Sequence, residues 1–148
     1  MDAGKQYLNL VTEFYPETLS RVMNYYRVQK KKDSVPHLLV KIYMFQLLRS
    51  LMYLHGSHQV AHRDIKPHNL LIDPDTQRLC LCDMGSAKRI TQKERSVAYI
   101  STRYYRAPEL LLSSDHYGVE VDIWAAGCVM AEMLRAGRVL FEGKSNAD

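Results

Sequence analysis

The sequence predicts an α+β fold in which helices dominate and the strands are short. Three observations support this: a long stripe of apolar residues at helical spacing, two short apolar runs separated by a turn signal, and a second apolar stretch near the end of the chain. With 148 residues and 47% apolar composition, the chain can bury one core and is most simply one domain.

The first expected elements are short. Tyr7–Thr12 alternates enough to be a strand, which Glu13–Pro16 interrupts. Glu17–Tyr26 is expected to be a helix, and the lysine-rich stretch Arg27–Asp33 is expected to be a solvated connector. These elements by themselves indicate no function.

A long helix is predicted from about Pro36 to His55. Its apolar residues recur on one helix face, which we expect to pack against a core. They are Val40, Met44, Leu47, Leu48, Leu51 and Leu54.

The loop His62–Asn69 that follows concentrates polar side chains around a proline. Pro67 lacks an amide hydrogen and biases Lys66 away from helical angles, so the loop must be an irregular turn. Such a turn can direct several side chains at one point. We expect His62 to pack beneath it.

A hairpin is predicted after this loop. Leu70–Ile72 and Leu79–Cys82 are its expected strands, and Asp73–Asp75 supplies the turn. The hairpin carries Asp83 back beside the loop that holds Asp64 and Asn69, so two carboxylates and an amide share one end of it.

The rest of the chain is predicted to be a polar loop and a buried helix. Gly85–Ala107 is polar, as a switchable segment must be. Val121–Leu134 contains only two charged residues, Asp122 and Glu132, so this helix is expected to be buried almost all round. Gly137 is expected to end it.

Composition argues against several classes of partner. The net charge of +4 is ordinary for a soluble domain, and no basic, aromatic-studded stripe indicates nucleic-acid binding. No apolar run is long enough to span a bilayer, so no membrane partner is expected. The three cysteines form no framework, which favours free thiols in a cytoplasmic or nuclear protein. The oligomeric state is not indicated.

Three clusters, taken in order, resemble motifs of protein kinases. His62-Arg63-Asp64 with Asn69 is similar to the catalytic loop, Asp83-Met84-Gly85 to the magnesium loop, and Ala107-Pro108-Glu109 to the end of the activation segment. Flanking stretches resemble glycogen synthase kinase 3, the shaggy branch of the cyclin-dependent and mitogen-activated kinase group. They are Pro16-Glu17-Thr18, Gly85-Ser86-Ala87-Lys88 and residues 101–109. The resemblance runs from about Tyr7 to Gly143.

The resemblance implies transfer of phosphate from ATP to serine or threonine in protein substrates, with Mg²⁺ as the metal. It assigns Asp64 to the substrate hydroxyl, Lys66 to the transferred group, and Asn69 and Asp83 to the metal. Thr102 would bridge Asp64 and Lys66. Asp122 would anchor the backbone of the catalytic loop.

The resemblance also implies further roles. The backbone at Glu13 and Tyr15 would bind adenine, Leu71 would complete the nucleotide site, and Thr12 would gate the pocket behind it. Tyr99 lies where the shaggy family is phosphorylated, with Arg103 and Arg106 placed to pair with that phosphate. Arg63 and Lys88 match two of the three basic residues that bind a phosphate already on the substrate, and the third would lie in the small lobe. Met84 replaces the usual phenylalanine, from which we expect altered mobility of its loop.

The expected domain is a partial kinase domain. Residues 1–16 would be the last small-lobe strand and the hinge, and residues 17–148 the large lobe up to its central buried helix. The Gly-rich loop and the strand lysine of kinases are absent from this sequence, so the chain alone is expected to be weak or inactive. The alternative is a non-catalytic, kinase-derived interaction module that competes for the partners of a full-length kinase.

Overall fold

The computed structural model describes residues 7, 9–91 and 102–143. Its helices are α1 (Leu19–Asn24), α2 (His37–Met52), α3 (Pro108–Leu111) and α4 (Val121–Leu134), and single π-helical turns extend α1 over Tyr25–Gln29 and α2 over Tyr53–Ser57. Its strands are β1 (Glu17–Thr18), β2 (Val60–Ala61), β3 (Leu70–Asp73), β4 (Arg78–Leu81) and β5 (Lys88–Arg89). Within these ranges, every helix is too short or too polar to cross a membrane.

The strands form two small antiparallel sheets. The first has the order β1-β3-β4, with Glu17 opposite Ile72 and Leu70 opposite Leu81. The second pairs β2 with β5 and places Ala61 opposite Lys88. The predicted hairpin is confirmed as β3–β4. The two-residue strand β5 lies in a segment predicted to be a loop, because two residues are too few to show alternation.

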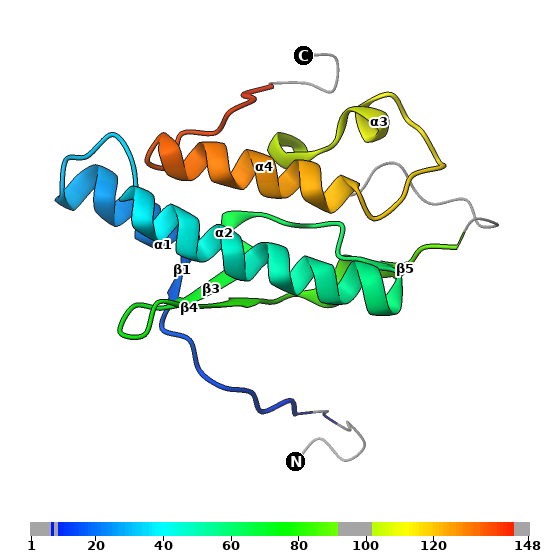
Figure 1. The fold of residues 1–148 in the computed structure, drawn as a ribbon, viewed down its shortest axis with the longest axis horizontal. Coiled ribbons are helices and arrows are strands. Elements are labelled where there is room, and N and C mark those ends of the chain that lie inside the picture. The colour runs from blue at the N-terminus through cyan, green and yellow to red at the C-terminus, as the bar shows by residue number, and fades with distance from the viewer. Residues whose placement is uncertain (1–6, 8, 92–101, 144–148) are drawn as a thin grey trace, which may run out of the picture.

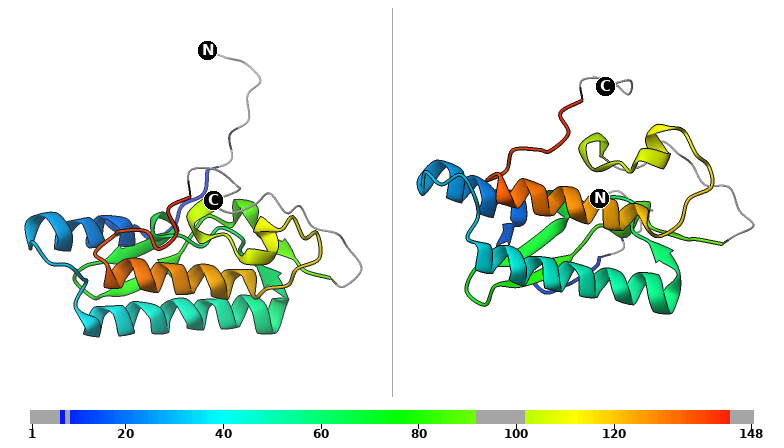
Figure 2. Two further views of the ribbon diagram at one scale, coloured as in Figure 1. Left: turned by 90° about the horizontal axis from the view of Figure 1, so that it is seen from above. Right: turned by 45° about the horizontal axis from the view of Figure 1, so that its top comes forward.

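The helices α2 and α4 run side by side, and the β3–β4 hairpin lies against α2 (Figures 1 and 2). The main core lies between these elements and α1, and its fully buried side chains include Leu19, Met23, Tyr43, Leu47, Leu51, Ile65, Ile72 and Met133. A smaller cluster joins α3 to the start of α4 and consists of Ala107, Leu110, Tyr117 and Val121. The loop His62–Asn69 contributes Ile65 to the main core.

The long helix is confirmed, but its buried face differs by one position from the prediction. Val40, Leu47 and Leu51 are buried as expected, whereas Leu48 is 43% exposed. Tyr43 takes the place of Leu48 on the buried face, since its ring reaches the core while its hydroxyl donates to Gln77. An amphipathic tyrosine can line a core when its hydroxyl finds an acceptor.

The last helix has the predicted bounds, Val121–Leu134, but the prediction that it is buried almost all round is wrong. One face packs on α2, while the opposite face exposes Ile123, Trp124 and Met130. Within the described residues that face is covered only in part, where the ring of Phe141 stacks on Trp124 with centroids 5.9 Å apart. A helix is buried all round only where neighbours cover every side.

The predicted strand Tyr7–Thr12 is also not found: none of its described residues is in a strand. Leu10 and Val11 are almost fully exposed. Figure 1 shows residues 9–16 leaving the helices as an extended segment. An alternating sequence becomes a strand only where another backbone pairs with it, and the first pairing here begins at Glu17.

Candidate active site

The backbone of the loop His62–Asn69 is held by the buried carboxylate of Asp122. Asp122, 1% exposed, accepts hydrogen bonds from the backbone nitrogens of His62 at 2.7 Å and Arg63 at 2.8 Å. His62 is fully buried, and its Nε2 lies 2.9 Å from the carbonyl oxygen of Cys82. The expected anchor at Asp122 and the expected packing of His62 are therefore confirmed. Arg63 adopts a left-handed φ of 67°, a strained conformation that these bonds maintain.

Three polar side chains contact the carboxylate of Asp64, two from the anchored loop and one from Thr102. The Nζ of Lys66 lies 2.7 Å from Asp64 Oδ2, and the Nδ2 of Asn69 donates to the same oxygen at 3.1 Å. Thr102 donates its hydroxyl to Asp64 Oδ1 at 3.0 Å, and Lys66 Nζ lies 3.2 Å from the same hydroxyl. The structure thus brings together all four residues that the sequence assigned to catalysis.

The pKa of Asp64 is lowered by this environment. Burial of the carboxyl would raise its pKa, but the hydrogen bonds and charge of Lys66 and the two hydrogen bonds from Thr102 outweigh burial. Asp64 is therefore ionised near neutral pH and can accept a proton or a hydrogen bond.

The hairpin brings Asp83 back to this loop, because the backbone nitrogen of Cys82 donates to the carbonyl of Asn69 at 3.0 Å. Asp83 has a left-handed φ of 65°, and its Oδ1 accepts from Gly85 N at 3.2 Å. The side-chain bonds of Asn69 to Asp64 both use its nitrogen. The amide oxygen of Asn69 and the exposed carboxylate of Asp83 are thus the atoms that could bind a hard cation.

These two oxygen ligands suit Mg²⁺ better than they suit a metal ion that is bound by protein side chains alone. Among the described residues, no group of three or more His, Cys, Asp or Glu side chains could hold a metal ion. Mg²⁺ is commonly bound by one or two protein oxygens and completes its shell with water and phosphate. A site with one carboxylate and one amide oxygen matches this coordination preference.

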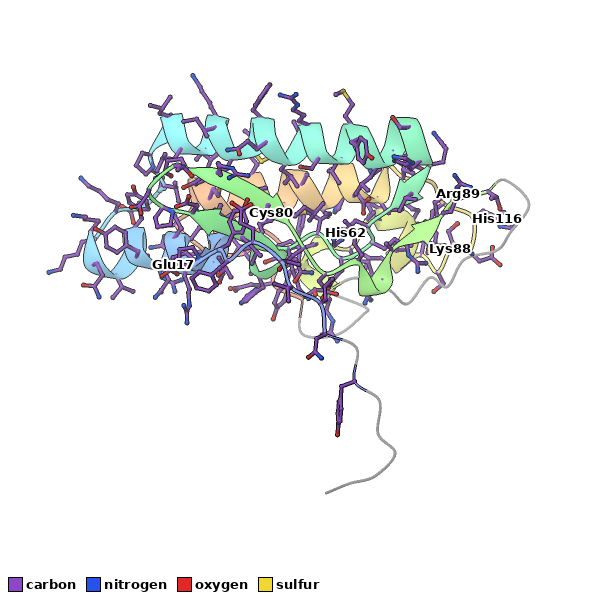
Figure 3. All side chains as sticks on the ribbon, turned by 90° about the horizontal axis from the view of Figure 1, so that it is seen from below. Glu17, His62, Cys80, Lys88, Arg89 and His116 are labelled. Carbon is purple, nitrogen blue, oxygen red and sulfur yellow. The ribbon has the colours of Figure 1, made fainter. Side chains whose placement is uncertain are left out.

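The two residues expected to bind a substrate phosphate come from paired segments. Lys88 on β5 lies opposite Ala61 on β2, and Arg63 is two residues further along the chain than Ala61. The Nε of Arg63 donates to the carbonyl of Ser86 at 2.6 Å, and its Nη1 donates to the hydroxyl of Tyr117 at 3.1 Å. Figure 3 shows Lys88 with Arg89 toward one end of the molecule and His62 nearer its middle.

The residues expected to bind adenine lie beside the hairpin. Glu13 pairs with Arg78 at 3.0 Å, and the guanidinium of Arg78 lies 6.0 Å from the ring centre of Tyr15. Leu71 lies on β3 opposite Cys80, and Cys80 shares with Tyr15 the wall of a groove of about 730 Å³. Thr12, the expected gate, is exposed.

Of the expected regulatory residues, Tyr99 lies outside the described residues. Arg103 begins a short 3-10 turn and is half-buried, while Arg106 is buried. Both make polar or electrostatic contacts in the structure.

Sequence reasoning missed three residues that support the site. His55 Nε2 lies 2.8 Å from Asp122 Oδ2, the hydroxyl of Tyr105 donates to Glu132 at 2.7 Å, and Tyr117 bonds to Arg63. Burial chiefly raises the pKa of both Tyr105 and Glu132, although their mutual hydrogen bond lowers that of Glu132. These partners are distant in sequence, so spacing alone carries no signal for them.

A family model described as protein kinase domain matches residues 2–148, nearly the whole chain. The match agrees with the short antiparallel sheets, the helices and the polar cluster around Asp64.

Proposed function

We propose that this chain, which belongs to the protein kinase family, derives from a serine/threonine kinase of the shaggy branch that transfers phosphate from ATP to protein substrates. The observation that carries the proposal is the convergence of Lys66, Asn69 and Thr102 on the carboxylate of Asp64. The lysine two residues after Asp64 supports serine or threonine as the acceptor.

In this proposal Asp64 orients the hydroxyl of the substrate and accepts its proton. Its lowered pKa keeps it in the ionised form that such a role requires. Lys66 places a positive charge where negative charge lies on the transferred group. Thr102 holds both side chains in place through its hydroxyl.

Asn69 and Asp83 would hold Mg²⁺ through hard oxygen ligands. When bound, the metal neutralises charge on the phosphates of ATP. The proximity of the two segments, fixed by the bond between Cys82 and Asn69, supports this assignment. Glu13, Tyr15 and Leu71 would contact the base and sugar end of the nucleotide.

The substrate class we propose includes proteins that already carry a phosphate, which would bind at Arg63 and Lys88. A phosphate added to Tyr99 would pair with Arg103 and Arg106. The pairing of β2 with β5 supports the first of these assignments, because it places Lys88 opposite Ala61, two residues before Arg63. The second rests on the resemblance.

We further propose that these 148 residues alone transfer phosphate slowly. The segment that would face adenine is exposed over Leu10, Val11 and Phe14. A nucleotide held mainly through its phosphates is positioned less well, and positioning supplies most of the catalysis in this reaction.

A phosphotransfer assay on the purified chain tests both statements. With Mg²⁺-ATP and serine, threonine and tyrosine peptides, we expect slow transfer to serine and threonine that Asp64→Asn abolishes. Asp75→Asn, on the exposed hairpin turn, is the matched control and should leave the rate unchanged. Equal rates for the chain and Asp64→Asn would contradict the proposed reaction. Turnover within about 1–100 s⁻¹, the usual range for kinases, would contradict the low rate.

A further inference from the structure

A cavity of about 590 Å³ lies apart from the residues proposed for catalysis. α1 and its π-helical turn form one wall through Tyr25 and Tyr26, α2 contributes Leu39 and Tyr43, and the hairpin turn contributes Pro74. Glu17, which also lines the cavity, lies at the opposite end of the molecule from Lys88 and Arg89 (Figure 3). We call this cavity the tyrosine groove.

The walls of the tyrosine groove are fixed by hydrogen bonds between α2 and the hairpin. The hydroxyl of Tyr43 donates to the side chain of Gln77, and Gln46 Nε2 donates to the carbonyl of Gln77 at 2.9 Å. Gln46 Oε1 also accepts from the backbone of Leu79 at 2.9 Å. A groove formed in advance loses little conformational entropy when it binds a ligand.

The lining of the groove suits a bulky apolar side chain. The rings of Tyr25 and Tyr26 meet edge to face with centroids 5.5 Å apart, and Tyr25 is 45% exposed. Val22 and Leu39 are partly buried against the core below. Aromatic rings that combine apolar faces with hydroxyl groups are enriched where proteins bind one another.

A basic edge borders the tyrosine groove. Lys30, Lys31 and Lys32 are all exposed, and the backbone nitrogens of Lys30 and Lys32 donate to the carbonyls of Tyr25 and Tyr26 at 3.1 and 3.0 Å. The Nζ of Lys30 lies 5.5 Å from the ring centre of Tyr25. These bonds hold the start of the lysine run against the aromatic wall.

The acidic residues near the groove do not cancel this edge. Glu17 lies 3.7 Å from Arg21, which offsets its charge. Asp73 accepts hydrogen bonds within its own turn, from the nitrogen of Asp75 and the hydroxyl of Thr76. Asp75 is exposed in the hairpin turn, next to Pro74 of the groove lining. The groove is thus basic along the edge formed by residues 30–32.

We infer that the tyrosine groove docks a linear peptide segment of a protein partner, with one bulky apolar side chain between Tyr25 and Leu39 and acidic residues over Lys30–Lys32. The occupant is selected by charge complementarity at the basic edge and by the apolar lining beside it. Docking there needs no phosphoryl transfer, so its failure would leave the proposed function untouched.

Fluorescence anisotropy with the full 148-residue chain tests the inference. The probe is a short labelled peptide with a central leucine–phenylalanine pair flanked by glutamates, and the comparison peptide carries lysines in place of the glutamates. We expect the acidic peptide to bind at least tenfold more tightly, and its affinity to fall as salt is raised. Equal affinity for both peptides would overturn the inference.

Variants locate the site. Replacing Lys30, Lys31 and Lys32 together by glutamate should weaken binding of the acidic peptide at least tenfold, and Tyr25→Ala should weaken it several-fold. Lys41→Glu, on an exposed position of α2 that does not line the groove, is the control and should change affinity less than twofold. Amide NMR shifts should fall on residues 21–32 and 74–77. Shifts confined to Trp124 and its neighbours on α4 would overturn the inference.

Discussion

The loop His62–Asn69 and the segment before β1 differ in how firmly the rest of the chain holds them. His62, Ile65 and Asn69 of the loop are buried, and Asp122 and Cys82 fix its backbone and its histidine. The segment from residue 9 to 14 is exposed throughout, and Val11 is 92% exposed. The exposed ion pair of Glu13 with Arg78 links this segment to the hairpin.

The difference shows which part of the proposed site the chain builds for itself. The end that would contact phosphates and metal is assembled from the loop, the hairpin and α4, whose mutual hydrogen bonds are buried or half-buried. The end that would contact adenine depends on a segment that makes few contacts. Four predictions test this contrast, and we order them by the size of the expected effect.

The largest effect is expected in the core that supports the loop. Leu47→Ala should lower the free energy of unfolding by about 2–5 kcal/mol, because it removes buried methyl groups and leaves a cavity. Val11→Ala, in the exposed segment, should change it by less than about 0.5 kcal/mol. Urea unfolding followed by circular dichroism measures both. Similar losses from the two variants would mean that the segment is packed.

The anchor of the loop should come next. Asp122→Asn replaces an acceptor by a group whose nitrogen faces other donors, so we expect a loss of about 1–3 kcal/mol of unfolding free energy. Asp33→Asn is the matched control, since Asp33 is almost fully exposed beside Arg138, and it should be close to neutral. Equal stabilities of the two variants would show that Asp122 does not hold the loop.

Thr102 should have a smaller effect, and this effect depends on pH. Thr102→Ala removes a hydrogen bond worth about 0.5–1.5 kcal/mol and should raise the pKa of Asp64, while Thr102→Ser should preserve that pKa. Because the folded-state pKa of Asp64 is lowered, its stabilisation is present above the unfolded value of about 3.9. It is lost as pH falls through the folded value. Carboxyl NMR titration measures the shift, and an unchanged pKa in Thr102→Ala would contradict the assigned contact.

The smallest effect is expected at Glu13. Glu13→Gln breaks an exposed ion pair with Arg78, which is worth less than about 1 kcal/mol and is screened by salt. Arg78→Gln should behave alike in the same urea experiment. A loss well above that bound would mean that the segment is held to the hairpin more firmly than its exposure indicates.

Local patterns predicted the parts of the fold that depend on nearby residues. The hairpin β3–β4 and the helix Val121–Leu134 follow from turn chemistry and apolar composition. The grouping of Asp64, Lys66 and Asn69 follows from the irregular turn at Pro67. Thr102 and Asp122 were assigned through the resemblance, which carries information on distant contacts that spacing lacks.

The failures concern contacts that a local pattern cannot show. The predicted strand Tyr7–Thr12 could form only by pairing with another strand. The predicted burial of α4 on all sides required a further element to cover its exposed face. On α2 the structure buries Tyr43 and exposes Leu48, and the hydrogen bond of Tyr43 to Gln77 joins residues that are distant in sequence. The bond between His55 and Asp122 joins residues far apart in sequence, so no spacing rule predicts it.

The central claim is that the loop His62–Asn69 and the segment after the hairpin form one site for a metal-bound nucleotide. Amide NMR of the chain, titrated with a non-hydrolysable ATP analogue with and without Mg²⁺, tests it most directly. We expect shifts at residues 64–69 and 82–85 that require Mg²⁺ and disappear in Asp83→Asn. Shifts that persist in Asp83→Asn, or that fall only on other elements, would contradict the claim.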